Sequence, residues 1–245
     1  MNTKVVAVLP ARLDSKRFSG KVLYQYLGKP LLYYVWKAVR RSKEIDRLLV
    51  ATDNKLVAET AAGFGAEVIM TSKRHRTGSD RVAEVMKGTR GAIWVNIQAD
   101  NLGVSAGALD RVIRHMKADP NCLYATMARR IEKDDDLFDP NVVKVVTAPD
   151  GRALWFSRYP IPYLRKATDS ERSGQHKFFE HIGIYFYRRR ALAAYALWKR
   201  STAEKAESLE QLRILENGGS MQVFNTKMAV VSIDTPKDLE KTKRL

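Results

Sequence analysis

The chain has 245 residues, of which 45% are hydrophobic, and a formal net charge of +16 at pH 7. Its single cysteine, Cys122, excludes an intramolecular disulfide and any multi-cysteine metal site. No apolar run approaches the ~20 residues of a membrane span, and the short run before Pro10 is too brief for a signal peptide. We therefore expect a cytoplasmic protein that forms one unit over residues 1–245 and has no membrane partner.

The first predicted elements form a βα unit around a basic loop. Residues 5–9 are aliphatic without polar alternation, which predicts a strand buried on both faces of a parallel sheet and ended by Pro10. Apolar residues at helical spacing predict a helix over 31–41. The loop between them carries Arg12, Ser15, Arg17, Gly20 and Lys21. Open α/β sheets bind ligands at the carboxyl ends of their strands, so this loop is a candidate anion site.

Strands and helices then alternate as far as residue 130, which predicts a doubly wound, mostly parallel sheet. The strands are expected at 47–52, 66–70, 92–97 and 123–129, and the helices at 55–63, 79–87 and 106–117. Beyond this point, closely spaced strand-like runs indicate an antiparallel excursion, at 142–147, 153–157 and 182–187. The chain is completed by helices at 190–199 and 207–215, a strand near 228–233 and a terminal helix from about residue 236.

The motifs, the histidine spacing and the distribution of charge argue against several classes of function. The sequence contains neither a glycine-rich dinucleotide motif nor a Walker loop, since Gly20-Lys21-Val22 lacks the upstream glycine and the hydroxyl residue after lysine. The four histidines show no helical metal spacing, which argues against a zinc enzyme. The positive clusters are scattered and fall partly on predicted helices, so solvated faces are favoured over a nucleic-acid groove. Nucleic-acid binding remains an alternative that rests on charge alone.

Two carboxylates directly follow apolar strands and are expected at the same sheet edge as the basic loop. These are Asp100, after residues 92–97, and Asp234, after the run near 228–233. Mg²⁺ usually takes one or two protein carboxylates and shares substrate phosphates, so the pair suits a metal site. The alternative is that Asp100 caps a turn and Asp234 caps the terminal helix, because Asp234-Thr235-Pro236 is also a helix-start signal.

Motifs in order along nearly the whole chain carry a family resemblance. They lie at residues 10–12 with 15, 17, 20 and 21, and at 51–53, 70–71, 78–81, 95–98 with 100, 141–146, 153–158 with 160–162, 181–185, 209–213 and 234–240. Together they resemble the CMP-KDO synthetases, the 3-deoxy-manno-octulosonate cytidylyltransferases. The resemblance implies a nucleotide-diphospho-sugar transferase fold, a Rossmann-like three-layer α/β sandwich. It also implies a nucleotide-binding half at 1–130, a sugar-binding and dimerisation excursion at 131–227, and a returning strand and helix at 228–245.

The resemblance further implies a reaction and a set of site residues. CMP would pass from CTP to the anomeric hydroxyl of KDO or a close analogue, releasing pyrophosphate, in the activation of sugars for lipopolysaccharide or capsule; the enzyme would be a Mg²⁺-dependent homodimer. The CTP phosphates would be held by Arg12 and Lys21, supported by Ser15 and Arg17. The cytidine pocket would be lined by Thr71, Arg76, Gly78 and Ser79. The sugar acid would be faced by Gln98, Arg158, His181, Tyr185, Glu210 and Gln211. The metal ligands would be Asp100 and Asp234. Without the family context, His181 and Tyr185 read as structural core residues.

Two loops depart from the family pattern. The chain reads Gln98-Ala99-Asp100-Asn101-Leu102 where Gln-Gly-Asp-Glu-Pro is usual, which disfavours a positive φ and removes a carboxylate beside the metal. It reads Phe18-Ser19-Gly20-Lys21-Val22-Leu23 where Leu-Pro-Gly-Lys-Pro-Leu is common, which removes two ring constraints. These changes raise the alternative of a catalytically weakened paralogue with a regulatory role. We favour an active enzyme because Asp100 is retained.

Overall fold

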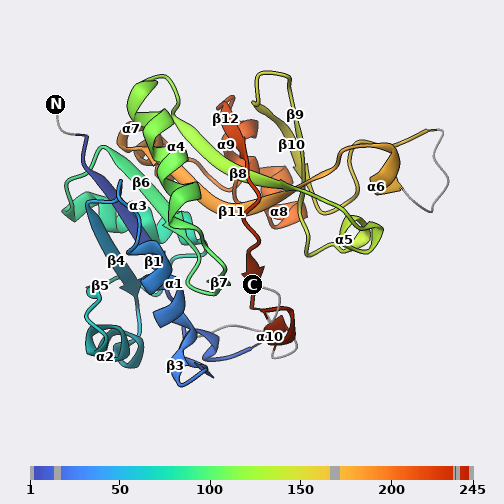
Figure 1. Cartoon of the computed structure of the whole chain (residues 1–245). Helices are drawn as coiled ribbons and strands as arrows, with labels where there is room; N and C mark the ends of the chain where they lie inside the picture. The colour runs from blue at the N-terminus through green and yellow to red at the C-terminus, as the bar shows by residue number, and fades with distance from the viewer. Residues whose placement is uncertain (1–2, 14–17, 166–171, 234, 236–237, 243–245) are drawn as a thin grey trace.

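A nine-stranded sheet forms the centre of the protein in the computed structural model (Figure 1). The structure describes residues 3–13, 18–165, 172–233, 235 and 238–242. The main path through the sheet runs β10-β9-β11-β6-β1-β4-β5, and β8 pairs with both β11 and β12. The long strands of the first half are β1 (Val5–Pro10), β4 (Arg47–Thr52), β5 (Glu67–Met70) and β6 (Ile93–Ile97), and they pair with one another in parallel. The predicted parallel sheet is confirmed.

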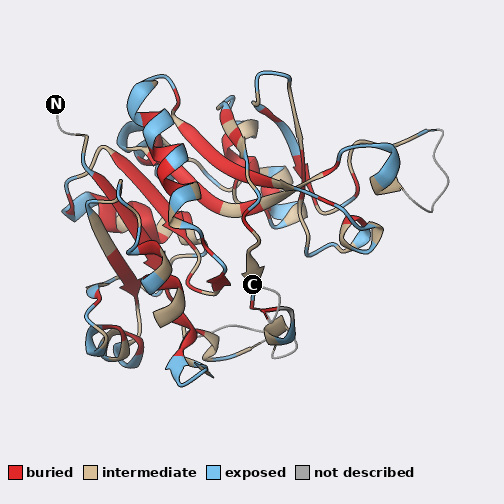
Figure 2. Ribbon diagram, viewed as in Figure 1, coloured by how far each residue is buried: buried red, intermediate tan, exposed pale blue. Residues whose placement is uncertain are grey.

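The central strand β1 contributes side chains to two separate cores, which makes the fold a three-layer sandwich. Every β1 residue is buried, and alternate side chains point to opposite faces. Val5, Ala7 and Leu9 join one core, whereas Val6 and Val8 join the other. Helices cover the first face with α1 (Leu31–Val39), α2 (Lys55–Gly63) and α4 (Ala106–Ala118). The second face is covered by α3 (Gly78–Gly88), α7 (Arg189–Leu197) and α9 (Leu212–Glu216). Figure 2 shows the buried strands between these exposed helix faces.

The second half of the chain adds antiparallel strands to the sheet, as predicted. The long strand β11 (Phe179–Arg188) pairs antiparallel with β6, with β8 (Tyr124–Arg130) and with β9 (Lys144–Thr147). The strand β10 (Ala153–Ser157) then pairs antiparallel with β9 and ends the sheet path. A further strand, β12 (Met221–Asn225), pairs parallel with β8 and was not predicted from the sequence.

The predicted helix at 207–215 is wrong. The helix α8 spans Thr202–Glu207 and ends at Ser208, whose φ of 54° is left-handed, and α9 begins only at Leu212. A capping box between Ser201 and Glu204 starts α8 early. Leu209 and Leu212 are both buried although a turn separates them. Their spacing of three residues matches the helical period, which led to the wrong prediction of one continuous helix.

The predicted strand near 228–233 is shorter than expected. Only β13 (Val231–Ser232) forms, and it pairs antiparallel with β7 (Asn101–Leu102). The terminal helix appears as α10 (Asp238–Lys241), while its predicted start at residue 236 lies outside the described residues. The remaining short elements are the 3₁₀ helix η1 (Lys21–Leu23), β2 (Gln25–Tyr26), β3 (Lys29–Pro30), α5 (Asp134–Phe138) and α6 (Arg172–Gln175). Within the part of the chain that the structure describes, none of the helices has the length and apolar character needed to cross a membrane.

Candidate active site

Lys21 and Asp100 meet at the carboxyl edge of the parallel strands. Lys21 begins η1 after Gly20, whose φ of 72° requires the freedom of glycine, and the Gly20 N–H donates to the carbonyl of Leu13 at 2.8 Å. Asp100 follows the end of β6. The ammonium and the carboxylate form an ion pair in which each side chain is 13% exposed. The structure therefore brings the basic loop and the first strand-end carboxylate together.

The backbone beside Asp100 is held by the returning segment of the chain. The N–H of Ile233 donates to the Asp100 carbonyl at 3.1 Å. Asp234 is the next residue in the sequence, but it lies outside the described residues, as do Ser15 and Arg17, so their roles stay predictions. Among the described residues no group of three metal-ligating side chains occurs. Mg²⁺ does not need one when substrate phosphates complete its shell, and the partly exposed Asp100 carboxylate is a suitable hard oxygen donor.

The altered residues around Asp100 and Lys21 are accommodated by the fold. Ala99 is 2% exposed and avoids the left-handed region, which among the described non-glycine residues only Leu27 and Ser208 occupy. Ala99 therefore does not need the positive φ that alanine disfavours. Asn101 and Leu102 pair with β13. In the first loop, the ring of Phe18 packs on that of Tyr24 at 5.3 Å, and Val22 is buried in the core. The packing of Phe18 and Val22 therefore restricts the conformation of this loop, where proline rings are common in the family.

Arg12 connects the basic loop to the segment before α3. Its Nη2 donates to the carbonyl of His75 and, at 3.4 Å, to that of Thr77. Burial, together with the nearby Arg81 guanidinium, lowers the pKa of Arg12. Thr77 is the N-cap of α3 and forms a capping box with Asp80. Arg12, which is predicted to hold the CTP phosphates, is thus hydrogen-bonded to the loop that precedes Gly78 and Ser79 of the predicted cytidine pocket.

Ser79 at the start of α3 lies in a buried network rather than on an open surface. Its hydroxyl is 2.7 Å from the hydroxyl of Tyr187 and accepts from Asn96 Nδ2 at 3.1 Å. Its N–H donates to Glu210 Oε2 at 3.2 Å. Burial raises the pKa of Glu210, although the N–H bond favours the ionised carboxylate. Glu210, predicted to face the sugar acid, therefore contacts the N-terminus of the helix assigned to cytidine.

Thr71 is held by a buried arginine that the sequence reasoning did not assign. Its N–H donates to the Thr52 carbonyl at 2.8 Å and continues the pairing of β4 with β5. Its hydroxyl accepts from Nη1 of Arg81, a fully buried side chain whose Nη2 donates to Asp53 at 3.0 Å. Asp53 and Arg81 lie in the motifs at residues 51–53 and 78–81. Their membership of these motifs could have identified them as site residues.

Arg76 is exposed on a different surface. It lines a hollow of about 680 Å³ on the outer side of α3, whose other residues are Ser72, Arg74, His75, Asp80, Ala83, Glu84, Lys87, Ala196, Trp198, Arg200 and Arg213. Of the predicted site residues that the structure describes, only Arg76 contributes to this hollow. The other predicted cytidine residues, Thr71, Gly78 and Ser79, do not line it.

Three of the predicted sugar-acid residues form one hydrogen-bonded cluster. The hydroxyl of Tyr185 donates to Gln211 Oε1 at 3.0 Å, and Gln211 Nε2 lies 3.3 Å from His181 Nδ1. The His181 ring packs against that of Phe156 at 4.8 Å. Burial lowers the pKa of His181 to about 3, so the imidazole is neutral at pH 7. In the pairing of β11 with β6, Ile184 lies opposite Ile97, which places residues 181–183 beyond the strand end that leads to Asp100.

Arg158 is oriented by Glu207, a residue that the sequence reasoning did not select. The backbone N–H of Arg158 donates to Glu207 Oε2 at 2.8 Å, and its Nε donates to the Glu207 carbonyl at 2.7 Å. Its Nη1 donates to the Pro140 carbonyl at 2.7 Å. The fully buried Lys144 donates to two further carbonyls of this turn, Asp139 at 3.0 Å and Val142 at 2.6 Å, and burial lowers its pKa to about 8. Lys144 stands in the motif at residues 141–146, whereas nothing in the sequence pattern marked Glu207.

Gln98 lies against the N-terminus of α3, where Gly78 leaves room for it. A Cβ atom on Gly78 would stand 2.7 Å from Gln98 Nε2 and 3.1 Å from Asn96 Nδ2. Asn96 is held by Ser79 and cannot yield, whereas the end of the Gln98 side chain can turn away. Gly78 therefore sets the position of the Gln98 amide.

Gly78→Ala should consequently displace Gln98 more than it destabilises the fold. We expect the KM for the sugar acid, which Gln98 is predicted to face, to rise about tenfold, the loss of roughly one hydrogen bond, with a small change in Tm. Steady-state kinetics with each substrate varied in turn measures this, and Gly63→Ala on α2, where a Cβ meets nothing within 4 Å, is the matched control. A large drop in Tm with unchanged KM would contradict the assignment.

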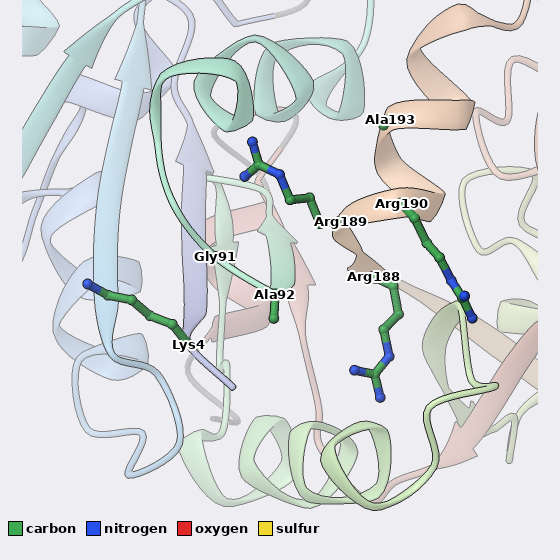
Figure 3. Close-up of a pocket in the computed structure, with 7 residues that line it drawn as sticks. All are labelled: Lys4, Gly91, Ala92, Arg188, Arg189, Arg190 and Ala193. Atoms are coloured by element: carbon green, nitrogen blue, oxygen red, sulfur yellow. The ribbon is translucent and has the colours of Figure 1, made fainter. Parts of the chain in front are cut away.

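A basic hollow at the opposite edge of the sheet accounts for part of the high charge (Figure 3). It has a volume of about 710 Å³ and is lined by Lys4, Gly91, Ala92, Arg188, Arg189, Arg190 and Ala193. The guanidinium of Arg189 turns to the end of α3, where it donates to Thr89 O at 2.7 Å and Met86 O at 3.0 Å. That of Arg188 turns the other way and donates to Asp119 O, after α4, at 3.0 Å. The guanidinium groups of Arg188 and Arg189 therefore donate hydrogen bonds to carbonyls at or after the C-termini of two helices, and they do not converge on one anion.

Comparison with known proteins gives full-length matches. A family model described as cytidylyltransferase matches residues 6–233. The 3-deoxy-manno-octulosonate cytidylyltransferase of Solibacter usitatus is 40% identical over 245 residues, covering 100% of this chain and 95% of that protein. The protein of the same name from Geobacter metallireducens is 40% identical over 243 residues, covering 97% of this chain and 96% of that protein.

Solved structures agree with these sequence matches. The structure of a CMP:2-keto-3-deoxy-manno-octonic acid synthetase complexed with CTP has a TM-score of 0.90 at 35% identity, and the match covers 98% of this chain and 97% of that chain. The inositol-1-phosphate CTP transferase of T. maritima has a TM-score of 0.68 at 14% identity, over 98% of this chain and 94% of that one, and so shares the fold alone.

Proposed function

The chain belongs to the cytidylyltransferase family, and on this premise we propose that it transfers CMP from CTP to the anomeric hydroxyl of KDO, releasing pyrophosphate. One observation of geometry carries the proposal: the Lys21–Asp100 pair and the His181 cluster lie at the same edge of the sheet. A nucleotide phosphate site next to a site for a second, polyhydroxylated substrate is what such a transfer requires. The match to a CTP-bound synthetase over 98% of the chain supports the same reaction.

The reaction proposed is an in-line attack of the sugar hydroxyl on the α-phosphorus of CTP. Such phosphoryl chemistry depends on alignment and on neutralising charge, and it needs no covalent nucleophile. Lys21 and Arg12, which the basic loop carries, would balance the charge of the triphosphate, and the contact of Lys21 with Asp100 supports this assignment. Arg158, oriented by Glu207 and the Pro140 carbonyl, is the candidate partner for the sugar carboxylate. Bound Mg²⁺ would acidify the sugar hydroxyl and stabilise charge on the phosphate, and Asp100 and Asp234 are the proposed ligands.

The altered loop at residues 99–102 does not favour a weakened regulatory paralogue. Ala99 sits without backbone strain, and Asn101 and Leu102 are engaged in β7. The residues that would hold the phosphates and the metal, Lys21 and Asp100, are in contact. We therefore propose an active enzyme that works in the cytoplasm, where CTP is made, in the activation of KDO for lipopolysaccharide or capsule.

We also propose that the enzyme is a homodimer that associates through its second half. The strand β10 ends the sheet path, and its Leu154 and Trp155 are 54% and 38% exposed. Tyr159 and Tyr163, which follow it, are 75% and 73% exposed. A terminal strand with large exposed apolar side chains suits pairing with a second copy. Sedimentation equilibrium would overturn the proposal by giving the mass of one chain.

Incubation of the purified protein with CTP, Mg²⁺ and KDO tests the proposed activity directly. Pyrophosphate release and a CMP-sugar product identified by mass spectrometry are expected. The panel should include the amino analogue of KDO and nonulosonic acids, because the sequence alone does not distinguish these substrates. Silence with every sugar acid, by protein that still binds CTP in calorimetry, would instead favour the regulatory alternative.

A further inference from the structure

Thr126 lies within β8 and contacts the His181 ring from the neighbouring strand, and it is not one of the predicted site residues. Its side chain is fully buried. The hydroxyl is 2.8 Å from His181 Nε2, 2.8 Å from the Ile184 carbonyl and 3.2 Å from the Ile182 carbonyl. One small polar group therefore contacts both the imidazole and the backbone of the neighbouring strand.

An irregularity in the pairing of β11 with β8 explains why the hydroxyl is needed. The register gives Ile182 opposite Met127 but Phe186 opposite Ala125, so β11 carries extra residues where β8 has only Thr126. A bulge of this kind leaves backbone groups of the longer strand without their ladder partners. The Thr126 hydroxyl lies at the Ile182 and Ile184 carbonyls in the bulge.

The direction of each hydrogen bond follows from these contacts. A hydroxyl has one proton, and carbonyl oxygens only accept, so the Thr126 proton goes to the backbone carbonyls. Toward His181 the Thr126 oxygen must accept, which places the ring proton on Nε2 and leaves Nδ1 as an acceptor. Gln211 Nε2 then donates to Nδ1, and Gln211 Oε1 accepts from Tyr185. Every group in the series has a single consistent role.

We propose that Thr126 is a positioning residue that holds His181 in its neutral Nε2–H tautomer and, through Nδ1, fixes the amide of Gln211. This inference rests on the proposed function for its catalytic meaning. A fixed amide presents its remaining N–H, and the Tyr185 hydroxyl its remaining lone pair, in a set pattern toward a polyhydroxylated substrate. His181 is then neither a general base nor a cation, and it acts as a rigid part of the sugar-acid site.

Thr126→Val keeps the shape of the side chain and removes the hydroxyl, and Thr126→Ser keeps the hydroxyl. We expect the valine variant to raise the KM for KDO about ten- to hundredfold with little change in the KM for CTP, since a buried N–H and two carbonyls lose their partner. The serine variant should restore the KM to within a few-fold of the original. An unchanged KM for KDO in the valine variant would overturn the proposal.

Nitrogen-15 NMR of the histidine rings gives a readout that a merely structural role would not move. In the unmodified protein at pH 7, His181 should show the Nε2–H pattern, identified by the signal that Thr126→Val changes and Thr126→Ser preserves. An Nδ1–H pattern for His181, or the same pattern in all three proteins, overturns the proposal. Should the valine variant fail to fold, the signal missing from His181→Gln identifies the His181 ring, and the unmodified and serine proteins still decide the tautomer. Absence of CMP transfer would refute the proposed function while leaving this spectroscopic result valid.

Discussion

Asp100→Ala should lower kcat by about 10³-fold or more while the protein stays folded. Asp100 is a carboxylate at the sheet edge where the phosphates are proposed to bind, and its removal takes away both a proposed Mg²⁺ ligand and a partner of Lys21. Loss of a preorganised electrostatic contact to the reacting phosphate typically costs about 10²–10³ in rate, and loss of a metal ligand adds to this. Pyrophosphate release under saturating CTP and KDO measures the effect.

Two further variants separate the charge of Asp100 from its shape. Asp100→Asn keeps the size of the side chain and should be nearly as inactive as alanine, because the neutral amide is a poor ligand for Mg²⁺. Glu59→Ala removes one carboxylate from an exposed position of α2 and should leave turnover unchanged. Circular dichroism checks the fold of each protein. Turnover of Asp100→Ala within tenfold of the unmodified enzyme would remove Asp100 from the metal site.

Arg213→Met should lower the free energy of unfolding by about 3–5 kcal/mol, because it breaks a buried ion pair. This is the largest effect on stability that we expect from any of the proposed variants. Arg213 is 2% exposed and connects its own helix α9 to α3, α7 and α8. Its Nε and Nη2 donate to the two oxygens of Glu204 at 2.8 and 2.6 Å, and its Nη1 donates to Asp80 at 3.1 Å. Its guanidinium carbon also stacks 4.3 Å from the centre of the Tyr195 ring. Without Arg213, the 1%-exposed Glu204 carboxylate would keep only the partly exposed Arg200, whose Nε lies 3.1 Å from Glu204 Oε1, as a cationic partner.

Urea unfolding of matched variants tests this explanation. Arg213→Met combined with Glu204→Gln should recover part of the lost stability, because the double variant buries no unpaired charge. Arg47→Ala breaks an ion pair with Glu67 whose side chains are 35% and 48% exposed, and it should cost no more than about 1 kcal/mol. A cost for Arg213→Met as small as that for Arg47→Ala would show that burial does not strengthen the Arg213 contacts.

The elements that the sequence predicted well are those in which local pattern and burial agree. Residues 5–9 form an unbroken aliphatic run because β1 is buried between two helical layers, and the same reason makes β4 and β6 recognisable. The helix α3 was recognised because polar capping residues precede its apolar face. Errors arose where apolar spacing was ambiguous, as at Leu209 and Leu212, which are buried from either side of a turn.

The sequence by itself determined the family, the order of strands and helices in the first half, and the strand-end placement of Lys21 and Asp100. These depend on residue types at fixed spacing, which a linear chain displays directly. Only the tertiary structure decided that Ala99 is free of strain, that Glu210 contacts Ser79, that Glu207 orients Arg158, and that Thr126 meets His181 across a bulge. Each of these contacts joins residues distant in sequence or depends on strand register, and neither residue type nor spacing carries that information.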